Sequence, residues 1–161
     1  FIPRREWGDR MQPEQFNDYC DRNLFFLNSV DKNIGANLFI RPYNKKKKCL
    51  ITDRYFKNKY KFTYENYYKE LLNSKIIIST YNSTTFLECF AINVPCILFW
   101  ENNYSKKDFL ILKKNNILFN DPIELSKFIN KNYSNIETWW YEDKVQNIIK
   151  DFRNKYIYSG S

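Results

Sequence analysis

The sequence contains no histidine at all. This absence excludes a Ser-His-Asp triad, a Cys-His nucleophile pair and a zinc site with histidine ligands from this chain. Cysteine is scarce too, and Cys20, Cys49, Cys89 and Cys96 form no CxxC pair. Cys89 and Cys96 lie in apolar runs, so we expect them to be small core residues. No Asp-x-Asp pattern occurs, and we predict neither a metal nor a cofactor.

Long hydrophobic stretches are also missing. No apolar run approaches the ~20 residues that a helix needs to span a bilayer, and no signal peptide is visible. The absence of paired cysteines favours the reducing cytoplasm as the compartment. The chain begins at Phe1 rather than at methionine and ends in Gly160-Ser161, so we expect a piece excised from a longer protein.

The residues that are abundant are apolar or basic. Hydrophobic residues make up 43% and aromatic residues 19% of the 161 residues, which suits one folded domain with a real core. The net charge is +8, with basic residues gathered at Lys45 to Lys48 and over 54–61. Such a balance suits nucleic acid, anionic lipid or small anions, and the alternative is a solvated surface without a binding role.

Apolar periodicity predicts alternating helices and strands. Helices are expected over 13–30, 64–73, 84–92, 105–115, 121–130 and 136–158, the last with a break near Trp139-Trp140. Strands are expected over 37–41, 49–52, 76–78, 95–100 and 117–119, after an irregular lead-in over 1–12. This order predicts a single α/β domain over 1–161. We expect a Rossmann-like, three-layer architecture in which helices flank a mostly parallel sheet.

Individual residues predict where several of these elements begin and end. Thr63 is expected to cap the helix over 64–73. The side chains of that helix expected to face the core are Tyr67, Tyr68, Leu71 and Leu72. Gly35 is expected to adopt a left-handed conformation after the first helix. Asp121, which precedes a proline, is expected to cap the helix that it opens.

Residues 75–100 (KIIISTYNSTTFLECFAINVPCILFW) organise the chain. Ile76 to Ile78 predict a strand that is covered on both faces, followed by a turn rich in hydroxyl groups, a helix and a second buried strand. The turn lies at the carboxyl end of a strand and the amino end of a helix, where open α/β sheets bind phosphorylated ligands. The candidate phosphate ligands are Thr80, Asn82, Ser83, Thr84 and Thr85.

The same residues allow a purely structural interpretation. Hydroxyl side chains before a helix are commonly caps, and the run from Thr85 to Glu88 matches the capping-box pattern S/T-x-x-E. Glu88 is a candidate acceptor for ribose hydroxyls, as an acidic residue is in dinucleotide-binding folds. It is equally a candidate partner for Thr85 in the capping box.

Three further residues are expected at the same edge of the sheet. Arg41 ends the strand over 37–41, where it either contacts a phosphate or pairs with a surface carboxylate. Trp100 and Tyr104 follow the strand over 95–100. Each of these two aromatic side chains either stacks on a base or packs in the protein.

Two segments carry a resemblance to a known family. The run ISTYNSTTFLECFAINVPCILFWENNY resembles the central signature of bacterial surface-carbohydrate transferases, which act on lipopolysaccharide or capsule and have glycosyltransferase-B architecture. The run IETWWYEDKVQNIIKDFRNKY is similar to the closing helix of that group in its double Trp, its Gln and its Phe. A more distant similarity links the strand, turn and helix to CDP-glycerol glycerophosphotransferases.

The resemblance implies the carboxyl-terminal half of such an enzyme, which binds the nucleotide of an activated sugar. It implies phosphate contacts from Arg41, Thr80, Asn82, Ser83, Thr84 and Thr85, and a ribose contact from Glu88. The implied partners are a nucleotide-sugar donor, a glycan or lipid-linked acceptor and the amino-terminal domain of the same protein. It also allows a peripheral contact at the inner face of the cytoplasmic membrane, and it implies no nucleic acid.

The segment after Trp100 departs from the family pattern. The family carries a longer segment there with another Trp and an Arg, whereas this chain has ENNYSKKDF, in which only Lys106 and Lys107 are basic. This departure motivates an alternative, a non-catalytic interaction domain of the same fold. A basic nucleic-acid-binding module is a further alternative, motivated by the run from Lys45 to Lys48. If the chain is a transferase, we expect it to be incomplete for catalysis by itself.

Overall fold

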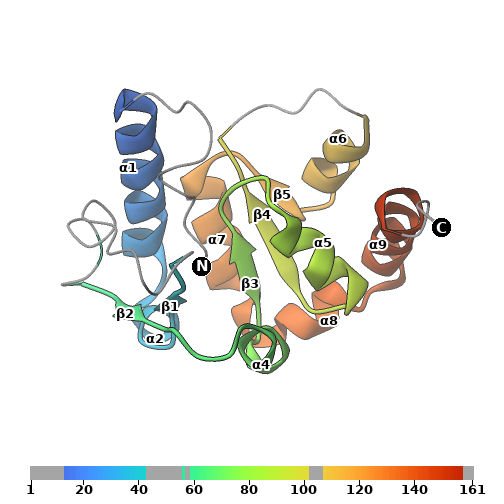
Figure 1. The fold of residues 1–161 in the computed structure, drawn as a ribbon, viewed down its shortest axis with the longest axis horizontal. Helices are drawn as coiled ribbons and strands as arrows, with labels where there is room; N and C mark the ends of the chain where they lie inside the picture. Colours follow the sequence, from blue (N-terminus) through green and yellow to red (C-terminus); the bar gives the residue numbers. More distant parts are fainter. Residues whose placement is uncertain (1–12, 43–55, 57–58, 102–106, 158–161) are drawn as a thin grey trace.

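The computed structural model describes residues 13–42, 56, 59–101 and 107–157 (Figure 1). Its centre is a parallel sheet in the order β3 (Ile77–Ser79), β4 (Cys96–Phe99) and β5 (Leu118–Phe119). A second parallel pair joins β1 (Phe39–Ile40) to β2 (Lys61–Phe62). Every ladder among the described residues is parallel, which confirms the predicted α/β class. The predicted strand over 49–52 and the lead-in over 1–12 lie outside the described residues.

Helices cover both faces of the central sheet (Figure 1). They are α1 (Pro13–Ser29), α2 (Lys32–Gly35), α4 (Tyr67–Asn73), α5 (Thr84–Ala91), α6 (Lys107–Lys114), α7 (Pro122–Asn132), α8 (Ile136–Trp140) and α9 (Asp143–Tyr156), with a 3-10 turn η1 (Tyr133–Asn135) before α8. One side chiefly carries α1 and α7, and the other carries α5, α6, α8 and α9. The arrangement is Rossmann-like. No helix in the described part of the chain is long and apolar enough to cross a membrane.

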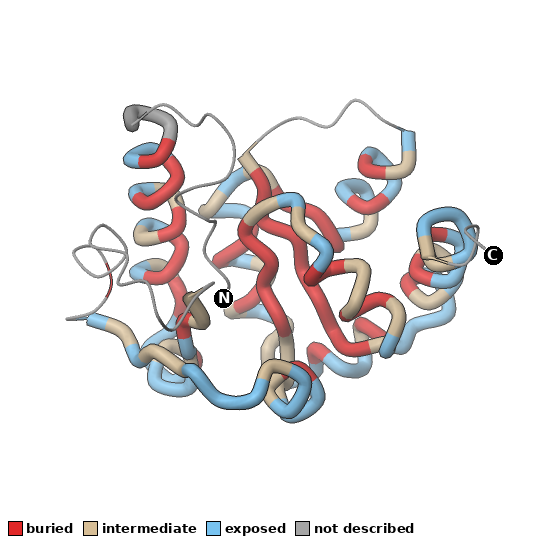
Figure 2. Tube along the Cα trace, in the orientation of Figure 1, coloured by how far each residue is buried: buried red, intermediate tan, exposed pale blue. Residues whose placement is uncertain are grey.

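Strand β4 shows why the sheet needs two helical layers. All four of its residues are buried (Figure 2). Cys96 and Leu98 belong to the core on the α5 side, whereas Ile97 and Phe99 belong to the core on the α1 side. Successive side chains of a strand point to opposite faces, so a strand without polar residues is stable only between two covering layers.

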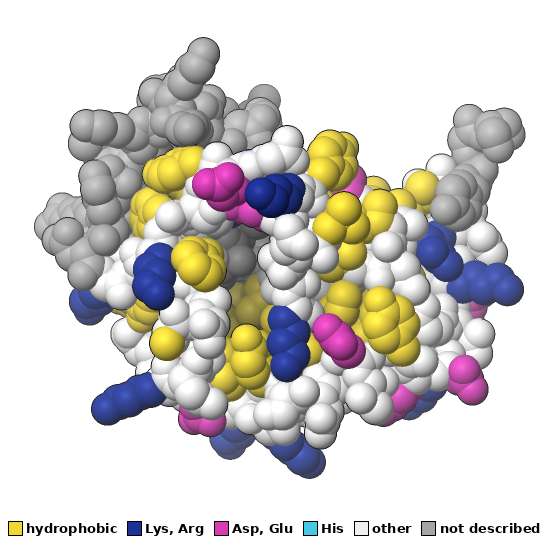
Figure 3. All heavy atoms as spheres, turned by 90° about the horizontal axis from the view of Figure 1, so that it is seen from below, with side chains coloured by type: hydrophobic (Ala, Val, Ile, Leu, Met, Phe, Trp, Pro, Cys, Tyr) yellow, Lys and Arg dark blue, Asp and Glu magenta, His cyan; other side chains and the backbone are white. Residues whose placement is uncertain are grey.

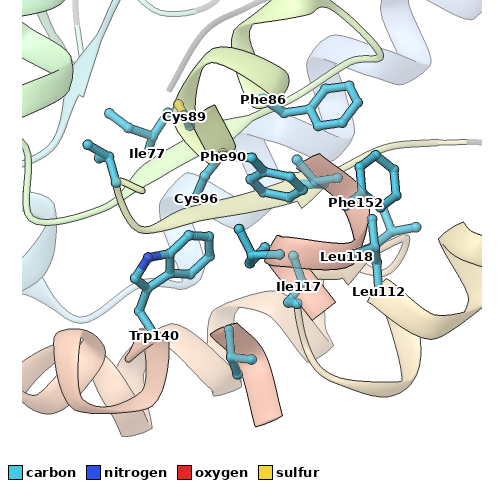
Figure 4. Close-up of a cluster of buried hydrophobic side chains, with 14 of the residues drawn as sticks. Ile77, Phe86, Cys89, Phe90, Cys96, Leu112, Ile117, Leu118, Trp140 and Phe152 are labelled. Atoms are coloured by element: carbon cyan, nitrogen blue, oxygen red, sulfur yellow. The ribbon is translucent and has the colours of Figure 1, made fainter. Parts of the chain in front are cut away.

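Aromatic rings fill the core on the α5 side (Figure 4). Phe86 and Phe90 meet edge to face at 5.6 Å between ring centroids, and Phe152 meets Phe90 at 5.7 Å. Cys89 and Cys96 lie fully buried beside these rings, which confirms their prediction as core residues. Burial, the leading cause, raises the pKa of the Cys96 thiol well above its ordinary value.

Three of the local predictions are wrong. The cap of α4 is Asn66, not Thr63, because the Asn66 side chain accepts a hydrogen bond from the backbone N–H of Lys69. Tyr68 and Leu72 do not face the core, because they lie 58% and 65% exposed on α4. Gly35 belongs to α2 and its φ is not positive, whereas a left-handed conformation occurs at Asn93 (φ 57°).

Two other local predictions are confirmed. Asp121 caps α7, and its carboxylate accepts hydrogen bonds from two backbone N–H groups of the first turn at 2.7 and 2.9 Å. The closing helix breaks near the double Trp, because α8 ends at Trp140 and α9 begins at Asp143. The cap of α7 depends on residues adjacent in sequence, which local patterns report well, whereas the break between α8 and α9 also involves the distant Asn93.

Side chains from three elements connect at that break. The indole N–H of Trp140 donates to Asn93 Oδ1 at 3.0 Å, and Asn93 Nδ2 donates to Gln146 Oε1 at 3.0 Å. Gln146 Nε2 in turn donates to the backbone oxygen of Trp140 at 2.7 Å. This closed set of hydrogen bonds fastens the α5–β4 turn to α8 and α9. It gives a structural role to the Trp and Gln of the closing segment.

Candidate functional site

The hydroxyl-rich turn occupies the predicted place between the end of β3 and the start of α5 (Figure 1). Ser83 is the N-cap residue of α5 and has an extended backbone, with φ −132° and ψ 171°. Its side chain makes no capping hydrogen bond, and its Oγ is buried without a partner among the described residues. Helices α4 and α7, in contrast, are both capped by a side chain. The first turn of α5 therefore has no side-chain cap, which is also true of α2, α8 and α9.

The capping-box interpretation is wrong. Helix α5 starts at Thr84, so Thr85 is its buried second residue rather than its N-cap. Glu88 accepts a hydrogen bond from the hydroxyl of Tyr67 on α4. Its carboxylate thus joins α5 to α4 instead of closing the amino end of its own helix, and the ribose contact stays a prediction.

Tyr67 connects two of the predicted site residues. The guanidinium of Arg41 lies 5.3 Å from the centroid of the Tyr67 ring, and the Tyr67 hydroxyl bonds to Glu88. Burial and this hydrogen bond both raise the pKa of Tyr67, burial being the larger cause. Two predicted residues that are far apart in sequence therefore belong to one contiguous set of contacts.

Arg41 makes the carboxylate contact that was one of its two alternatives. Its NH1 forms an ion pair with Glu70 and donates to the backbone oxygen of Glu65 at 2.9 Å. The same carboxylate accepts a hydrogen bond from the hydroxyl of Thr63. The phosphate contact of Arg41 stays a prediction, and it requires that Glu70 give way to a ligand.

Thr80 lies at the carboxyl end of β3 and is buried. Its hydroxyl lies 2.6 Å from the hydroxyl of Tyr19 on α1. Of the remaining candidates, Asn82 and Thr84 are exposed on the turn. The turn therefore combines accessible polar groups with one hydroxyl that fastens it to α1.

Trp100 is a core residue. It is 1% exposed, and its ring meets those of Phe86 and Phe109 at 5.1 and 5.5 Å between centroids. In this structure the faces of the Trp100 ring are covered by other residues of the protein. Of the two roles predicted for Trp100, packing in the protein and stacking on a base, the structure therefore shows packing. Tyr104 lies outside the described residues.

Sequence reasoning missed Arg22 of α1. Its NH1 donates to the backbone oxygen of Asn120 at 2.8 Å, and its guanidinium lies 4.5 Å from the ring centroid of Phe99. Asn120 follows β5 and donates from Nδ2 to the backbone oxygen of Trp100 at 2.9 Å. Arg22 therefore lies at the carboxyl ends of β4 and β5. This is the sheet edge that carries ligands in open parallel α/β folds.

A signal for this face of α1 was present in the sequence. Asn23 falls on the apolar stripe that Tyr19, Cys20, Phe26 and Leu27 define, and it is 1% exposed. Its Nδ2 donates to the backbone oxygen of Tyr19 at 2.8 Å, and its Oδ1 is buried without a partner among the described residues. Because buried polar side chains need hydrogen-bond partners, a polar residue on a buried stripe indicates that this face of the helix contacts polar groups of the protein as well as apolar ones.

The structure also contains a cavity of about 510 Å³ between β1 and β3. Figure 3 shows the hollow from below, with apolar side chains inside it and charged ones nearby. Both strands contribute to its wall, through Phe39 and through Ile76 to Ile78. Of the predicted site residues that the structure describes, Arg41 alone lines it. The cavity is therefore separate from the hydroxyl-rich turn.

No group of three or more Cys, Asp or Glu side chains suited to a metal ion occurs in the part of the chain that the structure describes. Among the described residues, the polar groups at the sheet edge include hydroxyls, amides, the guanidinium of Arg22 and carboxylates. Such groups bind anions and sugar hydroxyls by hydrogen bonds.

Comparison with protein families matches residues 7–160 to a family described as LIC12162 family transferase. The match includes both the hydroxyl-rich turn and the closing helices. No curated protein and no solved structure matches the chain.

Proposed function

Because the chain belongs to the LIC12162 family of transferases, we propose that it binds the nucleotide-sugar donor of a glycosyltransferase. The reaction moves a glycosyl group from the donor to a hydroxyl of a glycan or lipid-linked acceptor. The product is a bacterial surface polysaccharide such as lipopolysaccharide or capsule. The amino-terminal domain of the same protein supplies the general base, as in glycosyltransferase-B enzymes. The reaction takes place in the cytoplasm, at the inner face of the membrane.

The amino end of α5 is the observation that carries this proposal. The first backbone N–H groups of a helix have no partner within the helix and carry partial positive charge. Here Ser83 leaves that end without a side-chain cap. A donor phosphate accepts hydrogen bonds from these N–H groups and from the hydroxyls of Ser83 and Thr84. Negative charge grows on the leaving phosphate during transfer, so the same groups stabilise the transition state.

The other predicted residues complete the proposed site. Asn82 and Thr85 extend the set of polar groups around the turn, and Thr80 holds the turn against α1 through Tyr19. Arg41 turns from Glu70 to the phosphate when the donor binds, and Glu88 accepts hydrogen bonds from the ribose. No metal takes part.

Calorimetric titration with UDP-, GDP-, CDP- and CMP-linked sugars tests the proposal, with amide NMR shifts to locate the ligand. We expect one donor class to bind and to move the amides of Ser83 and Thr84. The double variant Ser83→Ala, Thr84→Val should lose about tenfold or more in affinity, because each charge-assisted hydrogen bond contributes substantially.

The matched control for this variant is Ser134→Ala, Thr138→Val. Both control residues are exposed and lie near the start of α8, remote from β3 and α5 in sequence. The control should bind the donor like the wild type. If no donor binds and the amides of the turn do not move, the proposal is overturned.

A non-catalytic domain of the same fold is the second candidate. The ion pair between Arg41 and Glu70 favours it, as does the burial of Trp100, because both residues are already engaged within the protein. Transferase turnover by the full-length protein, lost in the Ser83→Ala, Thr84→Val variant and kept in the control, would exclude this candidate.

A further inference from the structure

Arg22 is a half-buried cation with unused hydrogen-bonding capacity. A guanidinium has several N–H donors in one plane. Among the described residues Arg22 donates once, from NH1 to the backbone oxygen of Asn120. Its Nε is buried without a partner there, and no carboxylate of the described residues lies within ion-pair distance of it. Buried donors and charges are normally paired.

The surroundings of Arg22 hold the guanidinium in place. The Phe99 ring lies under it, with 4.5 Å between the guanidinium carbon and the ring centroid. Burial lowers the pKa of Arg22, while Glu101, Tyr19 and Asp121 favour its charged form. Arginine keeps its charge at neutral pH in any case. A fixed and partly dehydrated guanidinium binds an oxyanion more strongly than a freely moving one does.

The position of Arg22 relates it to the hydroxyl-rich turn. It lies one helical turn after Tyr19, and residues three apart on a helix are neighbours. The Tyr19 hydroxyl meets Thr80, which is the first residue after β3. Arg41, the cation that sequence reasoning assigned to this edge, is engaged with Glu70 instead.

We infer that Arg22 binds an oxyanion, namely a phosphate of the donor, from the α1 side of the hydroxyl-rich turn. The diphosphate of a nucleotide then lies between the amino end of α5 and the guanidinium. The nucleotide part of this inference rests on the proposed function, but the anion chemistry of Arg22 does not. The rival explanation is that Arg22 only braces α1 against the end of β5 through Asn120.

Calorimetry with UDP, GDP, CDP and inorganic pyrophosphate separates these explanations. Arg22→Gln should weaken binding by about tenfold or more, and Arg22→Lys should fall between it and the wild type, because lysine keeps the charge but loses the planar fork. Arg153→Gln is the matched control. Arg153 is also half-buried with a buried, unpartnered Nε among the described residues, but it lies on α9 across the sheet.

If Arg22→Gln unfolds, NMR of the arginine Nε–H group still tests the inference, because it is measured on the wild-type protein. The Arg22 signal of the wild type, assigned from Arg22→Lys, should shift on titration with pyrophosphate. Raised salt should weaken the binding, as for any anion site.

The outcomes distinguish the inference from the proposed function. Binding of a nucleoside diphosphate that depends on Arg22 supports both. Binding that is equal in Arg22→Gln and Arg153→Gln, with an unmoved Nε signal, overturns the inference and leaves the proposed function standing. Binding of pyrophosphate alone, dependent on Arg22, supports the anion site and counts against a nucleotide donor. No binding of any of the four probes overturns the inference and leaves the proposed function to the titration with nucleotide-linked sugars, which includes CMP-linked donors.

Discussion

Replacing Asn93 with glycine should destabilise the protein without affecting its backbone conformation. Asn93 has φ 57°, which glycine adopts without strain. The substitution removes the acceptor of the Trp140 indole N–H and the donor to Gln146. Trp140 is fully buried, so its N–H group loses its hydrogen-bond partner within the protein.

The expected magnitude follows from these contacts. An unsatisfied buried donor costs about 1–3 kcal/mol, and a partly buried side chain that regains water costs about 0.5 kcal/mol. The greater freedom of glycine in the unfolded chain adds up to about 1 kcal/mol. The sum, about 1.5–4.5 kcal/mol, is a large part of the roughly 5–15 kcal/mol that stabilise a typical domain.

Asn116→Gly provides the matched control. Asn116 also has a positive φ, of 60°, and its side chain makes no hydrogen bond to the other described residues. The control therefore carries the same change in chain entropy without the side-chain contacts. Urea unfolding monitored by far-UV circular dichroism measures both variants. If Asn93→Gly and Asn116→Gly differ by less than about 0.5 kcal/mol, the hydrogen bonds at the α8–α9 break contribute no stability and the reasoning fails.

Three further predictions concern ionisable groups. Burial and the hydrogen bond to Glu88 raise the pKa of Tyr67, so in the folded protein its phenolate should form only well above pH ~10. The difference in phenolate absorbance between the wild type and Tyr67→Phe, followed as the pH rises, measures this. A rise of that difference near the ordinary tyrosine pKa would contradict the prediction. Burial raises the pKa of Cys96 and shields its thiol, so mass spectrometry should find Cys96 alkylated only after unfolding. Hydrogen bonds from Lys155 and Tyr156 lower the pKa of Asp108 in the folded protein. The Asp108 carboxylate therefore stabilises the fold above its unfolded pKa of ~3.9, and this stabilisation is lost as the pH falls through the lower pKa of the folded state. Asp108→Asn should accordingly lower the melting temperature at neutral pH and not in strong acid, and an equal effect at both would refute the assignment.

The β3–α5–β4 unit could be predicted because its signals are local. Three consecutive isoleucines indicate a strand covered on both faces, and the apolar run from Cys96 indicates another. The cap at Asp121 is likewise encoded by neighbouring residues, whereas the break after Trp140 also involves the distant Asn93. Of the short pair β1–β2, the sequence predicted β1 but not β2. Lys61 and Phe62 form a strand because they pair with β1, and their own sequence pattern does not indicate one.

The sheet edge could be predicted only in outline. The position of the hydroxyl-rich turn follows from chain order, since the carboxyl ends of parallel strands share one edge. The contacts of individual side chains do not follow from it. Glu88 could be assigned to a capping box or to a ligand, and its contact with Tyr67 decided against the box.

By itself the sequence determined the order of helices and strands, the place of the hydroxyl-rich turn and the absence of histidine chemistry. Those properties depend on neighbouring residues or on composition. The tertiary structure alone placed Arg22 at the carboxyl ends of β4 and β5 and paired Arg41 with Glu70. Thr80 meets Tyr19 across 61 positions, and Arg22 meets Asn120 across 98. Contacts over such separations arise from the packing of α1 against the sheet, which no local pattern of charge or hydrophobicity records.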